Sequence, residues 1–136
     1  MIAVYPKQEQ LAALLASAEA GPVVMLNLLR FKERATAPDE GATGQEAYQR
    51  YGDAMIRLVE SRGGRLLWQG RVDSQVIGAE AEGFHVAALV EYTSRKAFVE
   101  IATSPEVAEI GVHRAAGLEG QWLLATTTHA RPLGSR

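Results

Sequence analysis

The chain has 136 residues, 47% of them apolar and 22% charged, which fits a single globular domain that can close its own core. The absence of cysteine excludes disulfide scaffolds, thiolate metal sites and cysteine nucleophiles. The net charge is −2 with no basic block, so the sequence predicts no binding to nucleic acid or to anionic membranes. It shows neither a secretory signal nor an apolar run near the ~20 residues of a membrane span, and we expect a cytoplasmic protein.

The first third of the chain predicts a helix, a strand and a long loop. Residues 7–18 carry leucines at helical spacing and predict a short amphipathic helix that ends before the Gly-Pro pair at 21–22. Residues 23–32 are apolar on both alternating faces, which is typical of a central strand covered on both sides. Residues 33–43 have no periodicity and predict a loop longer than most connections.

The middle of the chain predicts a helix followed by a hairpin. Thr43 and Glu46 have the spacing of a capping box, and the helix that they open extends to the glycines at 63–64. Residues 65–77 and 85–92 each predict a strand, and a polar, glycine-rich stretch separates them. We expect these two strands to pair as a hairpin.

The last third predicts a broken helix and a final strand. Ser94 is placed to cap a helix that runs to about residue 103, and Ser104 with Pro105 is placed to restart it, as far as Gly117. Residues 122–128 predict a strand.

The order of these elements predicts the fold class and the domain organisation. Without the first helix, the order is βαββαβ, so we expect an α+β, ferredoxin-like domain over residues 22–129. Residues 1–21 form an N-terminal helical extension and residues 130–136 a flexible tail in this prediction. A ferredoxin-like sheet has helices on one face only, whereas the first strand is apolar on both. The uncovered face therefore predicts a homodimer that packs sheet to sheet.

Asn27 is the most informative polar residue, because it interrupts the apolar first strand. A buried amide without a partner costs about 1–3 kcal/mol, so something must form a hydrogen bond with it. Two interpretations stay open: a core amide satisfied by backbone or water, and a pocket amide that orients a ligand oxygen.

Four other residues are candidates with a structural alternative. Arg30 lies on the opposite face of the strand from Asn27 and is more typical of a strand-end arginine paired with a carboxylate. Trp68 is either core or a pocket wall. Tyr51 lies with Tyr48 on the apolar stripe of the second helix, which we expect to pack onto the sheet, so it is either core or a pocket group. His113 has the titration range of a general acid or base but also suits the end of a helix.

Several motifs are missing from the sequence. The histidines lack the spacing of a metal site, and no phosphate-binding glycine loop or serine-hydrolase motif is present. We therefore predict no metal and no required cofactor.

Five segments together resemble a bacterial family known as domain of unknown function 1330 (DUF1330): GPVVMLNLLRFK, EAYQRYG, GGRLLWQG, ALVEYTSRKAFVE and SPEVAEIGVHRAAGLEG. The resemblance extends from about Gly21 to Leu124. That family belongs to the dimeric α/β-barrel superfamily, so the resemblance implies a ferredoxin-like protomer that closes its sheet against a second copy. The residues it implies as pocket-forming are Asn27, Arg30, Tyr51, Trp68, His113 and Arg114.

The superfamily includes cofactor-independent monooxygenases, isomerases and haem-binding or haem-degrading proteins, so fold analogy alone does not select a function. One hypothesis is an oxygenase or isomerase of small molecules, in which Asn27 holds a substrate oxygen, Trp68 walls the pocket and His113 moves the proton. The alternatives are a non-catalytic homodimeric binding or structural domain, and a haem protein.

Overall fold

The computed structural model describes residues 3–81 and 83–129. Its elements, in chain order, are α1 (Gln8–Leu15), β1 (Val23–Phe31), α2 (Gly44–Ser61), β2 (Arg65–Arg71), β3 (Val86–Tyr92), α3 (Arg95–Ala102), α4 (Pro105–Gly117) and β4 (Leu118–Thr126). The tail predicted at 130–136 lies outside the described residues.

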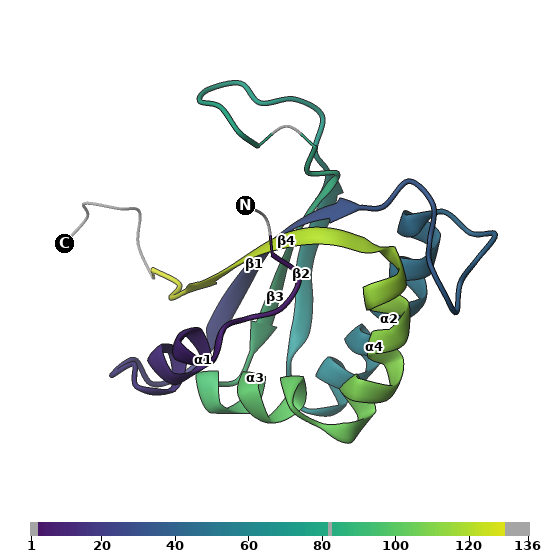
Figure 1. The fold of residues 1–136 in the computed structure, drawn as a ribbon. Helices are drawn as coiled ribbons and strands as arrows, with labels where there is room; N and C mark the ends of the chain where they lie inside the picture. Colours follow the sequence, from purple (N-terminus) through teal and green to yellow (C-terminus); the bar gives the residue numbers. More distant parts are fainter. Residues whose placement is uncertain (1–2, 82, 130–136) are drawn as a thin grey trace.

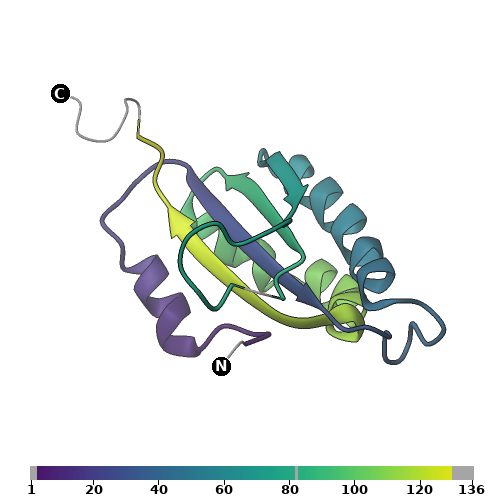
Figure 2. The same ribbon diagram turned by 90° about the horizontal axis from the view of Figure 1, so that it is seen from above.

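The four strands form one antiparallel sheet in the order β2-β3-β1-β4. Helices α2, α3 and α4 lie on one side of this sheet, and the segment between β2 and β3 stands out from the other side (Figure 1). The short helix α1 lies beside the β4 edge and is not part of the βαββαβ order (Figure 2). This arrangement confirms the predicted ferredoxin-like α+β fold and places both hairpin strands as expected. None of the described helices is long and apolar enough to cross a membrane.

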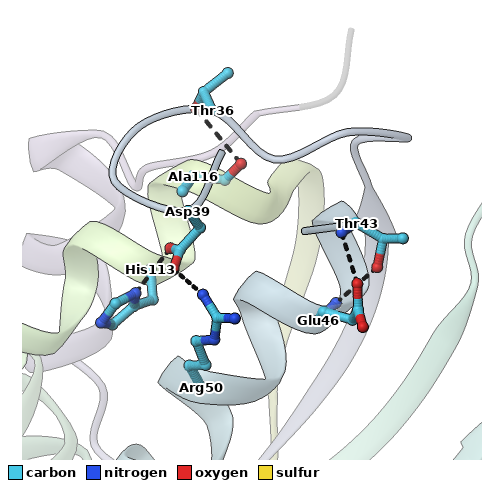
Figure 3. A network of polar contacts seen from close by, with 7 residues as sticks. All are labelled: Thr36, Asp39, Thr43, Glu46, Arg50, His113 and Ala116. Carbon is cyan, nitrogen blue, oxygen red and sulfur yellow. Dashed lines mark hydrogen bonds and ion pairs between the residues drawn. The ribbon is translucent and has the colours of Figure 1, made fainter. Parts of the chain in front are cut away.

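The predicted helix starts are confirmed by their hydrogen bonds. The N–H of Thr43 donates to the Glu46 carboxylate at 2.8 Å, and the N–H of Glu46 donates to the Thr43 hydroxyl at 3.1 Å (Figure 3). The Ser94 and Ser104 hydroxyls accept from backbone N–H groups at the starts of α3 and α4. Each cap satisfies an amide that the first helical turn leaves without a partner.

Two predicted strand boundaries are wrong by several residues, and the others differ by two residues at most. The first hairpin strand ends at Arg71 rather than at residue 77, because Val76 and Ile77 are 87% and 90% exposed and have no sheet or helix against them. The last strand begins at Leu118 rather than at residue 122. It follows α4 directly: Leu118 pairs with Phe31 of β1, and the N–H of Lys32, one residue after β1, donates to the Gly117 carbonyl at 2.8 Å.

The sheet has an inner face toward the helices and an outer face away from them. On the inner face, Met25 and Val90 pack with Val59 of α2 and Ile101 of α3 in the main core cluster. The alternate residues of each strand point to the outer face. The apolar residues there come from all four strands, and they include Leu26, Leu28, Trp68, Leu89, Trp122 and Leu124.

Two glycines allow the start of α2 to touch the end of α4. A Cβ at Gly117 would overlap the Gly44 carbonyl oxygen and lie 2.8 Å from the Tyr48 nitrogen, and both obstacles are backbone. A Cβ at Gly44 would in turn overlap the Lys32 backbone. This contact therefore requires glycine on both helices.

Replacing Gly117 by alanine should destabilise the protein. The added methyl meets backbone atoms that cannot rotate away, so we expect a loss of about 1–3 kcal/mol, as for other overpacked sites. Urea unfolding of Gly117→Ala gives the measurement.

Gly111→Ala is the matched control, because a Cβ at Gly111 in the same helix meets nothing within 4 Å. Alanine there should stabilise α4 by about 0.5–1 kcal/mol. Equal stability changes in the two variants would contradict the close contact.

Candidate functional site

A cavity of about 1510 Å³ lies between the inner face of the sheet and the helices. It is larger than the ~300–1,000 Å³ common among small-molecule sites. Its walls come from all four strands and all four helices, with residues 3–7 along the β4 edge. The half-buried or buried polar groups that line it include Asn27, Tyr48, Tyr51, Tyr92, Arg114 and Gln121.

A hydrogen-bonded chain of three side chains crosses this cavity wall. Nη2 of Arg114 on α4 donates to Oε1 of Gln121 on β4 at 2.7 Å. Nε2 of Gln121 donates to Oδ1 of Asn27 on β1 at 2.8 Å, and Nδ2 of Asn27 donates to the Met25 carbonyl at 3.2 Å. The buried amide therefore has the partners that the sequence requires. These hydrogen-bonded side chains also line a cavity. Asn27 is therefore satisfied by protein partners, as in the first interpretation, and lies in a pocket wall, as in the second.

The same arginine holds the N-terminal segment against the site. Its Nη2 also donates to the carbonyl of Val4, and its guanidinium carbon lies 5.3 Å from the centre of the Tyr5 ring. Ala3 pairs with Gln121 at the β4 edge. Residues 3–7 line the cavity as a result.

Three tyrosines contribute the other polar groups. Tyr48 and Tyr51 are neighbours on α2, with ring centres 5.4 Å apart, and Tyr92 comes from β3. Burial raises the pKa of all three phenols, so they are neutral at physiological pH and can donate hydrogen bonds. Among the described residues, their hydroxyls have no hydrogen-bond partner. Tyr48 and Tyr51 lie on the helix face that the sequence predicts, toward the sheet.

Of the residues predicted to form a pocket, Asn27, Tyr51 and Arg114 line this cavity together, and three others do not. Trp68 pairs with Leu89 on the outer face and is 53% exposed. Arg30 also lies on the outer face, 3.5 Å from the Glu119 carboxylate and 5.7 Å from the centre of the Phe84 ring.

His113 lies on the far side of α4, away from the cavity. Its Nδ1 is 2.7 Å from Oδ2 of Asp39, and Arg50 of α2 pairs with the other oxygen of the same carboxylate (Figure 3). The structure therefore separates His113 from Asn27 and Trp68. These three residues do not line one cavity within a protomer, as the joint role considered in the sequence analysis would require. No histidine of residues 3–81 and 83–129 lines the cavity.

Asp39 joins the long loop to both helices. Its side chain is only 2% exposed, and hydrogen bonds from His113 and Arg50 lower the pKa of its carboxyl. The N–H of Thr36 donates to the carbonyl of Ala116 at 3.0 Å and attaches the loop to the end of α4. The loop thus packs against the α2–α4 layer, and its residues do not line the cavity.

Sequence reasoning missed Gln121, Tyr92 and Asp39. Gln121 lies one residue before the predicted start of its strand, and only its register with Leu29 turns it toward the helices. Tyr92 resembles an ordinary strand aromatic. Asp39 lies in a segment without periodicity, and its partners are 11 and 74 residues away in the sequence.

Comparison with known proteins shows the family. The profile of DUF1330, a domain of unknown function, matches residues 41–128, so the chain belongs to this family. No curated protein matches the chain.

Solved structures show the same fold. A crystal structure of a protein of unknown function from Rhodopseudomonas palustris is 35% identical, with a TM-score of 0.87 over 96% of this chain and 100% of that one. A dimeric ferredoxin-like protein of unknown function from Jannaschia is 15% identical, with a TM-score of 0.54 over 79% of this chain and 100% of that one. A ferredoxin-like "dabb family" protein from Mesorhizobium loti is 14% identical, with a TM-score of 0.53 over 81% and 99% of the two chains.

The Asp39 network predicts a specific acid sensitivity. Because the folded-state pKa of Asp39 is below its ordinary value of 3.8, its contribution to stability is complete above that value and is lost as the pH falls toward the folded-state pKa. Asp39→Asn should therefore be less stable than wild type at neutral pH, and this difference should shrink below about pH 4. Urea unfolding over a pH series measures it.

Asp73→Asn provides the control, because the Asp73 side chain is 73% exposed in its pair with Arg71. Its stability should stay close to that of wild type across the series. A constant difference between wild type and Asp39→Asn down to pH 2 would contradict the role of this carboxylate.

Proposed function

We propose that this chain forms a homodimer in which each protomer binds a small apolar molecule between its sheet and its helices. The observation that carries the proposal is the cavity itself. It combines apolar walls, such as Met25, Leu29 and Phe98, with a small set of convergent polar groups around Asn27. That combination is typical of small-molecule sites.

The arrangement of titratable groups favours binding over proton transfer. An acid or base that works near neutral pH needs a matching pKa and a position beside the ligand. His113 has its Nδ1 on Asp39, outside the cavity, and burial keeps the cavity phenols neutral. We therefore propose a binding domain rather than an oxygenase or isomerase. It also uses no haem, because the described histidines offer no axial ligand on the cavity wall.

The homodimer is supported by the outer face of the sheet. Trp68, Trp122 and Leu124 expose 43–53% of their surface there, beside half-buried leucines of β1 and β3. A continuous apolar face of this kind marks an association site. The ferredoxin-like relatives from Jannaschia and from Thermobifida fusca are described as dimeric. A second copy of the same face would cover these side chains.

The cavity predicts binding of a neutral apolar probe. Ethylnaphthalene should bind to wild type, and Ala88→Phe should weaken this binding at least tenfold, because the new ring would stand beside Asn27, the register partner of Ala88. Isothermal titration calorimetry measures the affinity, and circular dichroism checks that the variant is folded.

Ala13→Phe makes the same change on the exposed side of α1, away from the cavity, and should leave the affinity unchanged. If Ala88→Phe folds and still binds the probe as wild type does, the proposed site is wrong.

The outer face predicts the oligomeric state. Sedimentation equilibrium should give twice the 14.7 kDa mass of the chain. Leu124→Glu should weaken the dimer by at least tenfold, because it would bury a carboxylate in the apolar interface.

Leu15→Glu is the matched control, since Leu15 on α1 is 51% exposed and Leu124 is 49% exposed. Dissociation by both variants, or by neither, would contradict an interface at the outer face.

A further inference from the structure

The direction of the hydrogen-bonded chain in the cavity wall is fixed by its two ends. A guanidinium can only donate, so the oxygen of Gln121 must face Arg114 and its nitrogen must face Asn27. The Asn27 side chain then presents its oxygen to Gln121 and its nitrogen to the Met25 carbonyl, which can only accept. Only one orientation of both amides satisfies all three bonds.

This orientation leaves a donor on the cavity wall. The Nδ2 of Asn27 carries two protons, and the Met25 carbonyl accepts one of them. The described residues offer no acceptor for the other. Because Asn27 lines the cavity, the second N–H is available to a bound molecule.

Three phenols on the wall can add further donors. The hydroxyls of Tyr48, Tyr51 and Tyr92 can each donate or accept a hydrogen bond and have no partner among the described residues. The charged side chains that line the cavity are four cations and one anion: Lys7, Arg57, Arg71, Arg114 and Asp53. Arg114 is the only half-buried one of these five, and the other four are exposed.

We infer that the cavity selects apolar molecules that carry a hydrogen-bond-accepting oxygen, as a ketone, enolate or carboxylate does, and that Gln121 sets this preference by holding the Asn27 N–H toward the ligand. The inference rests on the proposed function, since it specifies the ligand class of the same cavity. Gln121 is a positioning residue here: it acts through Asn27.

Three naphthalenes separate the contributions. Ethylnaphthalene measures apolar burial alone, acetylnaphthalene adds a neutral acceptor oxygen, and naphthoate adds a charged one. Wild type should bind acetylnaphthalene about tenfold more tightly than ethylnaphthalene, as one hydrogen bond predicts. It should bind naphthoate at least as tightly as the ketone.

Gln121→Glu tests the relay, which is the hydrogen-bonded series Arg114–Gln121–Asn27. The new carboxylate can only accept hydrogen bonds. It would still pair with Arg114, but the Asn27 amide would have to turn its nitrogen toward residue 121. That turn breaks its hydrogen bond to the Met25 carbonyl and places its oxygen at the cavity in place of the N–H. The tenfold preference for the ketone should then fall to about one or reverse. Both of these probes are neutral, so the ratio does not depend on the added charge.

Gln69→Glu is the matched control, since Gln69 lines the same cavity from β2 and lies outside the relay. It should keep the tenfold ratio. If Gln121→Glu does not fold, Asn27→Leu takes its place, and it should also lose the preference for the ketone.

The outcomes distinguish the inference from the proposed function. Binding of ethylnaphthalene with no preference for the ketone in wild type would overturn the ligand class and leave the cavity proposal standing. A preference that survives Gln121→Glu, or Asn27→Leu where Gln121→Glu does not fold, would overturn the role of the relay. No binding of any of the three naphthalenes would overturn both proposals.

Discussion

The amide of Asn27 must find hydrogen-bond partners in the middle of an apolar strand, and much of the structure follows from how it does so. Gln121 reaches it from β4, Arg114 reaches Gln121 from α4, and Arg114 also binds the carbonyl of Val4. The hydrogen bonds that begin at Asn27 thus connect β1, β4, α4 and the N-terminal segment. An unsatisfied amide here would cost about 1–3 kcal/mol, a large part of the stability of a small domain.

The helix layer leaves room for the cavity because its main contacts are made elsewhere. Gly44 and Gly117 bring α2 and α4 backbone to backbone at one end, and the buried Asp39 joins the same two helices through Arg50 and His113. These contacts hold the helices to each other. The sheet and the helices then meet in the cluster around Met25, Val59 and Ile101 and in a smaller one in which Phe31 contacts Tyr48.

Local and periodic signals in the sequence predicted the fold well. The capping box at Thr43 and the serine caps depend on neighbouring residues, so their spacing identified the helix starts. The amphipathic stripe likewise placed Tyr48 and Tyr51 toward the sheet. The strand ends were less predictable, because whether Val76 and Ile77 join a sheet depends on cover that other parts of the chain must supply.

The site was predicted only in part, since it depends on contacts between distant residues. Asn27 was recognisable because a polar residue in an apolar strand is unusual at any position. Its partner Gln121 is ordinary in composition and is 94 residues away, and strand register alone brings the two together. His113 carries the expected chemistry, but its partner Asp39 holds it on the other side of α4.

The central claim is that the Asn27 amide lines a cavity that an apolar molecule enters. Asn27 is the only asparagine in the chain, so labelling with ¹⁵N-asparagine gives one side-chain NH₂ signal pair for direct observation by NMR. Titration with acetylnaphthalene should shift this pair saturably, with the larger change at the proton that does not face Met25. A side-chain pair that stays unchanged at saturating probe would contradict the account.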